Sequence, residues 1–220
     1  MKMREKIILA LDVDTFATAR HFVNLFYPKI RIFKVGSQLF TGCGPEIVEF
    51  IQKKGGEVFL DLKYFDIPNT VAKAVAQAGH LKVKMLTLHI SGGPEMIRAA
   101  VASVRQIKKK QRPLLIGVTV LTSQKAGKEK ILALAKAGLA SGLDGVVCSA
   151  QETGFLRKKI NRKFIIVTPG IRPKSGAKND QQRIATARES LKAGSSFLVI
   201  GRPILEASRP LSALEEILKS

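Results

Sequence analysis

The sequence contains only two cysteines, Cys43 and Cys148, among its 220 residues. Two cysteines do not make a disulfide framework, and these two have no zinc-ligand spacing. The three histidines are far apart in the sequence, and no paired His/Glu spacing typical of a metal enzyme is present. We therefore expect free thiols and no metal site.

Long apolar runs are also missing. None reaches the roughly 18 residues that a helix needs to span a bilayer. The apolar run that follows the basic first residues ends at Asp12, which is too short for the core of a signal peptide. Domain linkers and low-complexity tracts are absent as well. We expect a cytoplasmic protein without a membrane partner, folded as a single domain over residues 1–220.

Acidic residues are few: 17 Asp and Glu stand against 37 Lys and Arg, a formal net charge of +20. Such a charge suits nucleic acid, an acidic membrane surface or anionic small substrates. The basic residues are scattered, however, with short clusters at 108–110 and 157–159 and no recognisable nucleic-acid module. We interpret them as solvated helix faces, compatible with weak steering of a phosphorylated substrate, and expect no nucleic-acid partner.

Apolar strand-like runs alternate with amphipathic helix-like segments along the whole chain. The runs are residues 7–11, 31–35, 57–62, 85–89, 114–121, 145–148, 164–167 and 197–200. The helical segments are residues 16–26, 45–54, 71–78, 95–109, 129–141, 151–158, 182–193 and 211–218. This order predicts an α/β fold, a closed (β/α)8 or TIM barrel. A doubly wound open sheet is the competitor, but no strand-linked Gly-x-Gly-x-x-Gly favours it.

Charged side chains gather where the third strand ends. Asp61 and Lys63 are two residues apart and so point to the same face of a strand, and Asp66 follows as the chain leaves it. Lys34 ends the neighbouring second strand. The simpler interpretation is a structural salt bridge. Against it, desolvating each ion costs several kcal/mol unless it is paired, and ionisable groups stand at the ends of most other strands too.

The active site of such a barrel lies at the carboxyl ends of the strands. Asp12, His89, Thr119 and Thr122 follow strands one, four and five. Gly170 and Arg172 follow strand seven, and Gly201 and Arg202 follow strand eight. These residues suit a phosphate site, because glycine lets an anion approach the backbone amides and arginine binds phosphate oxygens bidentately. Residues 173–180 have the polar composition of a mobile lid.

These motifs together resemble one family. Asp61-x-Lys63-x-x-Asp66-Ile67-Pro68-Asn69-Thr70, preceded by Lys34-Val35-Gly36 and followed by Thr168-Pro169-Gly170-Ile171-Arg172 and Gly201-Arg202, is similar to the orotidine 5′-phosphate decarboxylases. The likeness covers nearly the whole chain. Asp-x-Lys-x-x-Asp alone is shared by a wider set of barrel enzymes, and the two extensions make the match specific.

The resemblance implies loss of CO2 from orotidine 5′-phosphate to give UMP, in pyrimidine biosynthesis, without metal or organic cofactor. It implies that Lys63 protonates C6 of the pyrimidine, that Asp61 lies against the substrate carboxylate, and that Lys34 orients Asp61 and contacts the ribose. It further implies a homodimer with shared active sites, in which Asp66, Ile67 and Thr70 reach the site of the partner subunit. The other substrate contacts that it implies are Asp12 to the ribose, Thr122 to the pyrimidine, and Pro169, Arg172, Gln181, Gly201 and Arg202 around the phosphate.

Two alternatives remain open. A sister barrel enzyme, 3-keto-L-gulonate 6-phosphate decarboxylase or hexulose-phosphate synthase, uses a related motif with magnesium held by an added acid, whereas the second strand here ends in Lys34. The other is a barrel that has lost its activity and binds nucleic acid through its basic surface. A complete set of four clustered charges argues against a pure binding protein.

Overall fold

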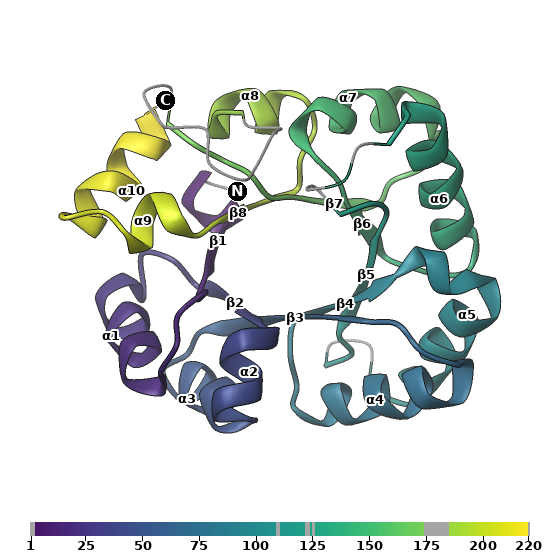
Figure 1. The fold of residues 1–220 in the computed structure, drawn as a ribbon, viewed down its shortest axis with the longest axis horizontal. Coiled ribbons are helices and arrows are strands. Elements are labelled where there is room, and N and C mark those ends of the chain that lie inside the picture. The colour runs from purple at the N-terminus through teal and green to yellow at the C-terminus, as the bar shows by residue number, and fades with distance from the viewer. Residues whose placement is uncertain (1–2, 109–110, 122–123, 125, 174–184, 220) are drawn as a thin grey trace.

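The computed structural model describes residues 3–108, 111–121, 124, 126–173 and 185–219. Eight parallel strands close into a barrel in chain order, with β8 paired to β1 (Figure 1). They are β1 (Ile7–Ala10), β2 (Ile32–Gly36), β3 (Glu57–Tyr64), β4 (Met85–His89), β5 (Leu114–Val118), β6 (Gly145–Val147), β7 (Ile165–Thr168) and β8 (Phe197–Ile200). The predicted (β/α)8 barrel is confirmed.

Helices surround the barrel on its outside (Figure 1). They are α1 (Phe16–Phe26), α2 (Ser37–Cys43), α3 (Glu46–Lys53), α4 (Pro68–His80), α5 (Gly93–Ser103), α6 (Lys128–Ala140), α7 (Ala150–Lys159), α8 (Ala187–Lys192), α9 (Arg202–Leu205) and α10 (Pro210–Lys219), with short 3-10 turns η1 (Met3–Lys6) and η2 (Ile90–Gly92). Thr15 caps the first turn of α1: its hydroxyl accepts a hydrogen bond from the Thr18 backbone N–H at 3.1 Å.

Each strand has one face toward the helices and one toward the barrel axis. The outer faces pack with the helices in one large apolar core. The inner faces form a second, smaller cluster that includes Ile8, Ile32, Phe59, Ile116 and Val199. Both faces are therefore buried, which explains why the strands are continuous apolar runs in the sequence.

The structure corrects several predicted boundaries. β3 extends two residues beyond the expected end, β5 ends at Val118 instead of 121, and α5 ends at Ser103 instead of 109. The helices α2 and α9 were not predicted, because each lies in a loop of the expected β-then-α pattern. Residues 182–184, the expected start of the eighth helix, lie outside the described residues.

Both cysteines are free, as expected: Cys148 is buried and Cys43 is partly buried. Burial raises the pKa of the Cys148 thiol to about 12, so this thiol stays protonated at neutral pH. In the described part of the chain, no helix has both the length and the apolar character needed to cross a membrane.

Candidate active site

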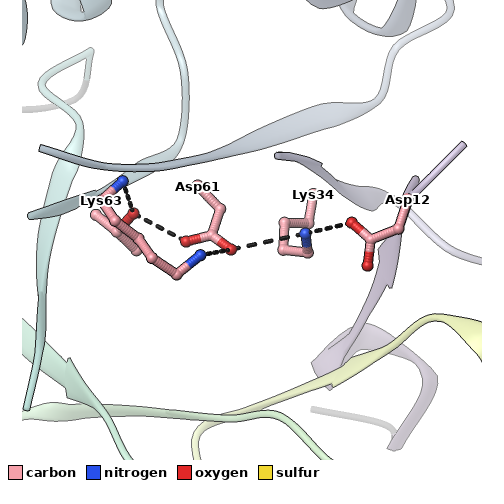
Figure 2. Close-up of polar contacts among 5 residues, drawn as sticks. Asp12, Lys34, Asp61 and Lys63 are labelled. Carbon is pink, nitrogen blue, oxygen red and sulfur yellow. Dashed lines mark hydrogen bonds and ion pairs between the residues drawn. The ribbon is translucent and has the colours of Figure 1, made fainter. Parts of the chain in front are cut away.

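Four charged side chains, from β2, from β3 and from the loop that follows β1, form a chain of ion pairs at the carboxyl end of the barrel (Figure 2). The Lys34 ammonium lies 2.7 Å from Asp12 Oδ1 and 3.6 Å from Asp61 Oδ2. The Lys63 ammonium contacts the same Asp61 oxygen at 2.9 Å. Positive and negative groups therefore alternate in the order Asp12, Lys34, Asp61, Lys63.

The strand register explains how Lys34 reaches between the two aspartates. Lys34 pairs with Ala10 on one side and Phe59 on the other, one layer below the level of Asp61. Gly36 pairs with Asp61 in the upper layer. A Cβ on Gly36 would lie 3.1 Å from Lys34 Nζ and 3.5 Å from Asp12 Oδ1, so glycine leaves the space that the rising ammonium fills. In the sequence, Gly36 stood out only as part of a motif, so this role was not predicted.

Asp61 is a buried carboxylate, with only 9% of its surface exposed. Burial alone would raise its pKa, but the charges of Lys34 and Lys63 and hydrogen bonds from Lys63 and Thr87 outweigh burial, and the pKa lies below its ordinary value. Asp61 is therefore ionised at neutral pH, and its negative charge is fixed on the wall of the pocket.

Lys63 stands on an irregular stretch of β3. Its φ is 52°, in the left-handed region, and the pairing of β3 with β4 shifts register between Leu60 and Tyr64. Simple alternation along the strand was therefore not the right reason to place Asp61 and Lys63 on one face. The bulge turns the Lys63 side chain so that its ammonium still meets Asp61.

Thr87 on β4 was not predicted as a site residue, yet it holds both charged groups. Its hydroxyl donates to Asp61 Oδ1 at 2.9 Å and accepts the backbone N–H of Lys63 at 2.9 Å, and the residue is fully buried. The only signal in the sequence was a polar residue inside the otherwise apolar run of this strand.

A pocket of about 250 Å³ opens above these charges. Its opposite wall comes from the loops after β7 and β8 and includes Pro169, Gly170, Arg172, Gly201 and Arg202. Arg172 is buried, with 7% of its surface exposed, and its backbone N–H donates to Ala185 O at 3.1 Å. The pocket thus has a charged network at one end and two arginines at the other.

Gly201 brings the backbone close to the first strand. A Cβ at this position would lie 3.3 Å from Ala10 Cβ and 3.5 Å from Asp12 Oδ2. Any larger side chain would therefore press on the wall that carries Asp12.

Three predicted site residues lie outside this pocket. Asp66, Ile67 and Thr70 are exposed, on the loop that leads into α4 and on the first turn of that helix. Asp66 Oδ1 accepts the Ile67 N–H at 2.6 Å, and Ile67 is 66% exposed. Within one chain, three of the four expected catalytic charges meet.

Other predicted residues have different positions. Thr119 is buried and does not line the pocket. Its hydroxyl donates a structural hydrogen bond to Val147 O at 3.0 Å. His89 lies beside the site; burial first and the Lys63 charge second hold its pKa below the ordinary value. Thr122, Gln181 and all but the first residue of the expected lid 173–180 lie outside the described residues.

The chain is similar to known proteins over nearly its whole length. The model of the Orotidine 5'-phosphate decarboxylase / HUMPS family matches residues 5–217. This chain belongs to that family. A protein named orotidine 5'-phosphate decarboxylase from Syntrophotalea carbinolica is 45% identical to this chain over 233 aligned residues. The alignment covers 100% of this chain and 96% of the relative. The protein of the same name from Coxiella burnetii is 46% identical over 223 aligned residues, which cover 96% of this chain and 94% of the relative.

The fold comparison gives the same family. A crystal structure titled orotidine 5'-phosphate decarboxylase from Lactobacillus acidophilus superposes with a TM-score of 0.81 and 33% identity, covering 98% of both chains. Among the described residues, no group of three His, Cys, Asp or Glu side chains is arranged to hold a metal ion.

Proposed function

We propose that this protein decarboxylates orotidine 5′-phosphate to UMP in pyrimidine biosynthesis, with Lys63 as the proton donor. The observation that carries the proposal is the Lys63 ammonium, 2.9 Å from the buried Asp61 carboxylate in a pocket that ends in two arginines. Relatives at about 45% identity over nearly the full chain carry the name of this activity.

The proton donor and the leaving group meet at one carbon. The bond from C6 of the pyrimidine to its carboxylate breaks, CO2 leaves, and the electron pair remains on C6. The Lys63 ammonium stabilises this developing negative charge and then transfers its proton to C6. Lys63 regains a proton from solvent, so the cycle consumes one proton and needs no oxidant or reductant.

Asp61 repels the carboxylate of the bound substrate. Its carboxylate is held ionised by Lys34 and Lys63, so it cannot relieve repulsion by taking up a proton. A substrate carboxylate placed against it is destabilised, and loss of CO2 removes that repulsion. The binding energy that holds the substrate there comes from groups far from C6.

The phosphate end of the pocket supplies that energy. Arg172 and Arg202 line the wall formed by the loops after β7 and β8 together with Pro169 and Gly201. A guanidinium group can bind two phosphate oxygens at once, and glycine lets the backbone approach the anion. We assign Gln181 to the same phosphate and Thr122 to the pyrimidine.

Asp12 and Lys34 are assigned to the ribose. The Lys34 ammonium lies between the carboxylates of Asp12 and Asp61, at 2.7 and 3.6 Å. A divalent cation bound by the two aspartates would have to displace this ammonium. The arrangement therefore favours a metal-independent reaction over the magnesium-dependent sister reactions, and we propose that no organic cofactor takes part.

We also propose a cytoplasmic homodimer in which Asp66, Ile67 and Thr70 complete the site of the partner subunit. In support, all three are exposed outside the pocket of their own chain. Ile67, at 66%, and its neighbour Phe65, at 62%, are the large apolar side chains that are exposed among the described residues. Such a C2 arrangement gives two identical composite sites.

The direct test is the loss of orotidine 5′-phosphate absorbance on adding purified protein, with and without EDTA. We expect turnover that EDTA does not change, with UMP as product. Absence of turnover in a folded protein, followed by magnesium-dependent turnover of a sugar phosphate, would assign the chain to the sister reaction instead.

A further inference from the structure

The fold gathers basic residues at the amino-terminal end of the barrel, opposite the candidate active site. The connections that lead from helices into β2, β3, β4 and β5 contain lysine and arginine but no Asp or Glu. Six of these residues define what we call the basic face, and they lie in the connections that precede four neighbouring strands: Arg31, Lys54, Lys82, Lys84, Lys108 and Arg112.

The basic face surrounds a hollow. A cavity of about 410 Å³ lies between the end of α3 and the first residues of β3, β4 and β5, and Lys82, Lys84 and Arg112 line it. Lys84 is paired with Glu57 at 2.7 Å. The side chains of Arg31, Lys54, Lys82 and Lys108 are exposed.

Backbone contacts hold these connections next to one another. Glu57 N donates to Arg31 O at 2.7 Å, Lys84 N donates to Val58 O at 2.8 Å, and Leu114 N donates to Lys84 O at 2.9 Å. The basic residues are therefore fixed side by side although the sequence separates them. An anion that binds across them relieves their mutual repulsion. When the anion is a polyanion, binding also releases its condensed counterions.

We propose that the basic face binds a single strand of nucleic acid through its phosphates. Several connections contribute charge, which an extended chain of phosphates can contact together and a small anion cannot. A flat bilayer would not fill the hollow, and the large apolar side chains exposed among the described residues, Phe65 and Ile67, do not line it. The basic residues looked scattered in the sequence because neighbouring strands of the barrel lie about 25 residues apart along the chain.

The test is fluorescence anisotropy of a labelled single-stranded RNA, titrated with the whole protein at two salt concentrations. The RNA is about 20 nucleotides long, so that it spans several contacts. The variant Lys82→Gln/Lys108→Gln/Arg112→Gln removes three charges from the basic face. The control Lys73→Gln/Lys130→Gln/Lys136→Gln removes three exposed charges from the outer sides of α4 and α6. None of the six belongs to the candidate active site, so decarboxylase activity reports that each variant is folded.

We expect wild type and control to bind with a Kd that weakens steeply with salt. The basic-face variant should bind at least about 10-fold more weakly, with a salt slope smaller by about 2, since each lost contact to a single strand removes about 0.7 from it. Equal weakening in both variants would mean that net charge alone acts, and the proposal would fail. It would also fail if RNA did not bind at low salt, or if only vesicles rich in phosphatidylserine bound.

Discussion

Asp61 is held by three partners in the pocket. It accepts hydrogen bonds from Lys63 and Thr87, each at 2.9 Å, and has the Lys34 ammonium 3.6 Å away. A buried carboxylate with three such partners is stabilised in its charged form. The proposed catalysis depends on that charge, and the same charge links the stability of the protein to pH.

Replacing Asp61 by Asn should show this linkage. Because the folded-state pKa of Asp61 lies below its ordinary value, its contribution to stability is present above about pH 4 and is lost as the pH falls through the folded-state pKa. We expect Asp61→Asn to lower the free energy of unfolding by about 2 kcal/mol at neutral pH. Urea denaturation should show the difference from wild type shrinking in acid. A difference that did not change with pH, or that matched the exposed control Glu216→Gln, would contradict the assigned charge state.

Lys63→Ala tests the proton donor. Lys63 combines a proton transfer with stabilisation of the developing charge on C6, so we expect kcat to fall by more than about 10⁴-fold. The side chain of Lys63 is 38% exposed, and Asp61 keeps its contact with Lys34, so the variant should fold. Absorbance kinetics and circular dichroism measure the two results, with Lys73→Ala as the control on an exposed helix position. Activity close to wild type would remove Lys63 from its role.

At the scale of elements, β4 positions what β3 carries. Thr87 donates to the Asp61 carboxylate and accepts the backbone N–H of Lys63, where φ is 52°. The hydroxyl therefore stabilises a strand conformation that a lysine rarely adopts. We interpret Thr87 as a positioning residue for both charged groups.

Thr87→Val keeps the shape of the side chain and removes the hydroxyl. We expect kcat to fall about 10- to 100-fold while KM changes less, because small displacements of catalytic groups affect the transition state most. Thr87→Ser retains the hydroxyl and should recover most of kcat. If both variants lost kcat equally, packing and not the hydrogen bonds would explain the effect.

The sequence predicted the elements better than it predicted local irregularities. Continuous apolar runs and helical spacing were enough for eight strands in a closed order, because both faces of each strand are buried. The bulge at Lys63 could not be predicted, since it depends on the pairing of β3 with β4. The helix α9 was missed because its four residues are too few to show a helical pattern in the sequence. The roles of Gly36 and Thr87 were missed for the same reason: each depends on a neighbour across the sheet.

At the scale of the whole molecule, the two ends of the barrel carry different charge patterns. Acids and bases alternate at the carboxyl end, where Asp12, Lys34, Asp61 and Lys63 form ion pairs. At the other end, basic residues are mostly unmatched by acids in the connections before β2 to β5. The basic face therefore lies at the end of the barrel opposite the ion pairs of the candidate active site.

Three of the four proposed catalytic charges meet within one chain. Lys34, Asp61 and Lys63 meet in the pocket, whereas Asp66 lies outside it on the exposed loop before α4. Our central claim is that a second copy supplies Asp66. Two subunits with different defects should then form one intact site between them.

The most direct measurement mixes two inactive variants, Lys63→Ala and Asp66→Ala, by refolding them together. In a mixed dimer, the site built on the intact Lys63 receives Asp66 from the other chain, so about a quarter of all sites are wild-type in a random mixture of C2 dimers. We predict recovery of about that fraction of wild-type turnover. Mixing Lys63→Ala with Asp61→Asn is the control and should recover nothing, because both residues belong to the same chain's half of the site. No recovery in the first mixture, or full activity of Asp66→Ala alone, would contradict the shared site.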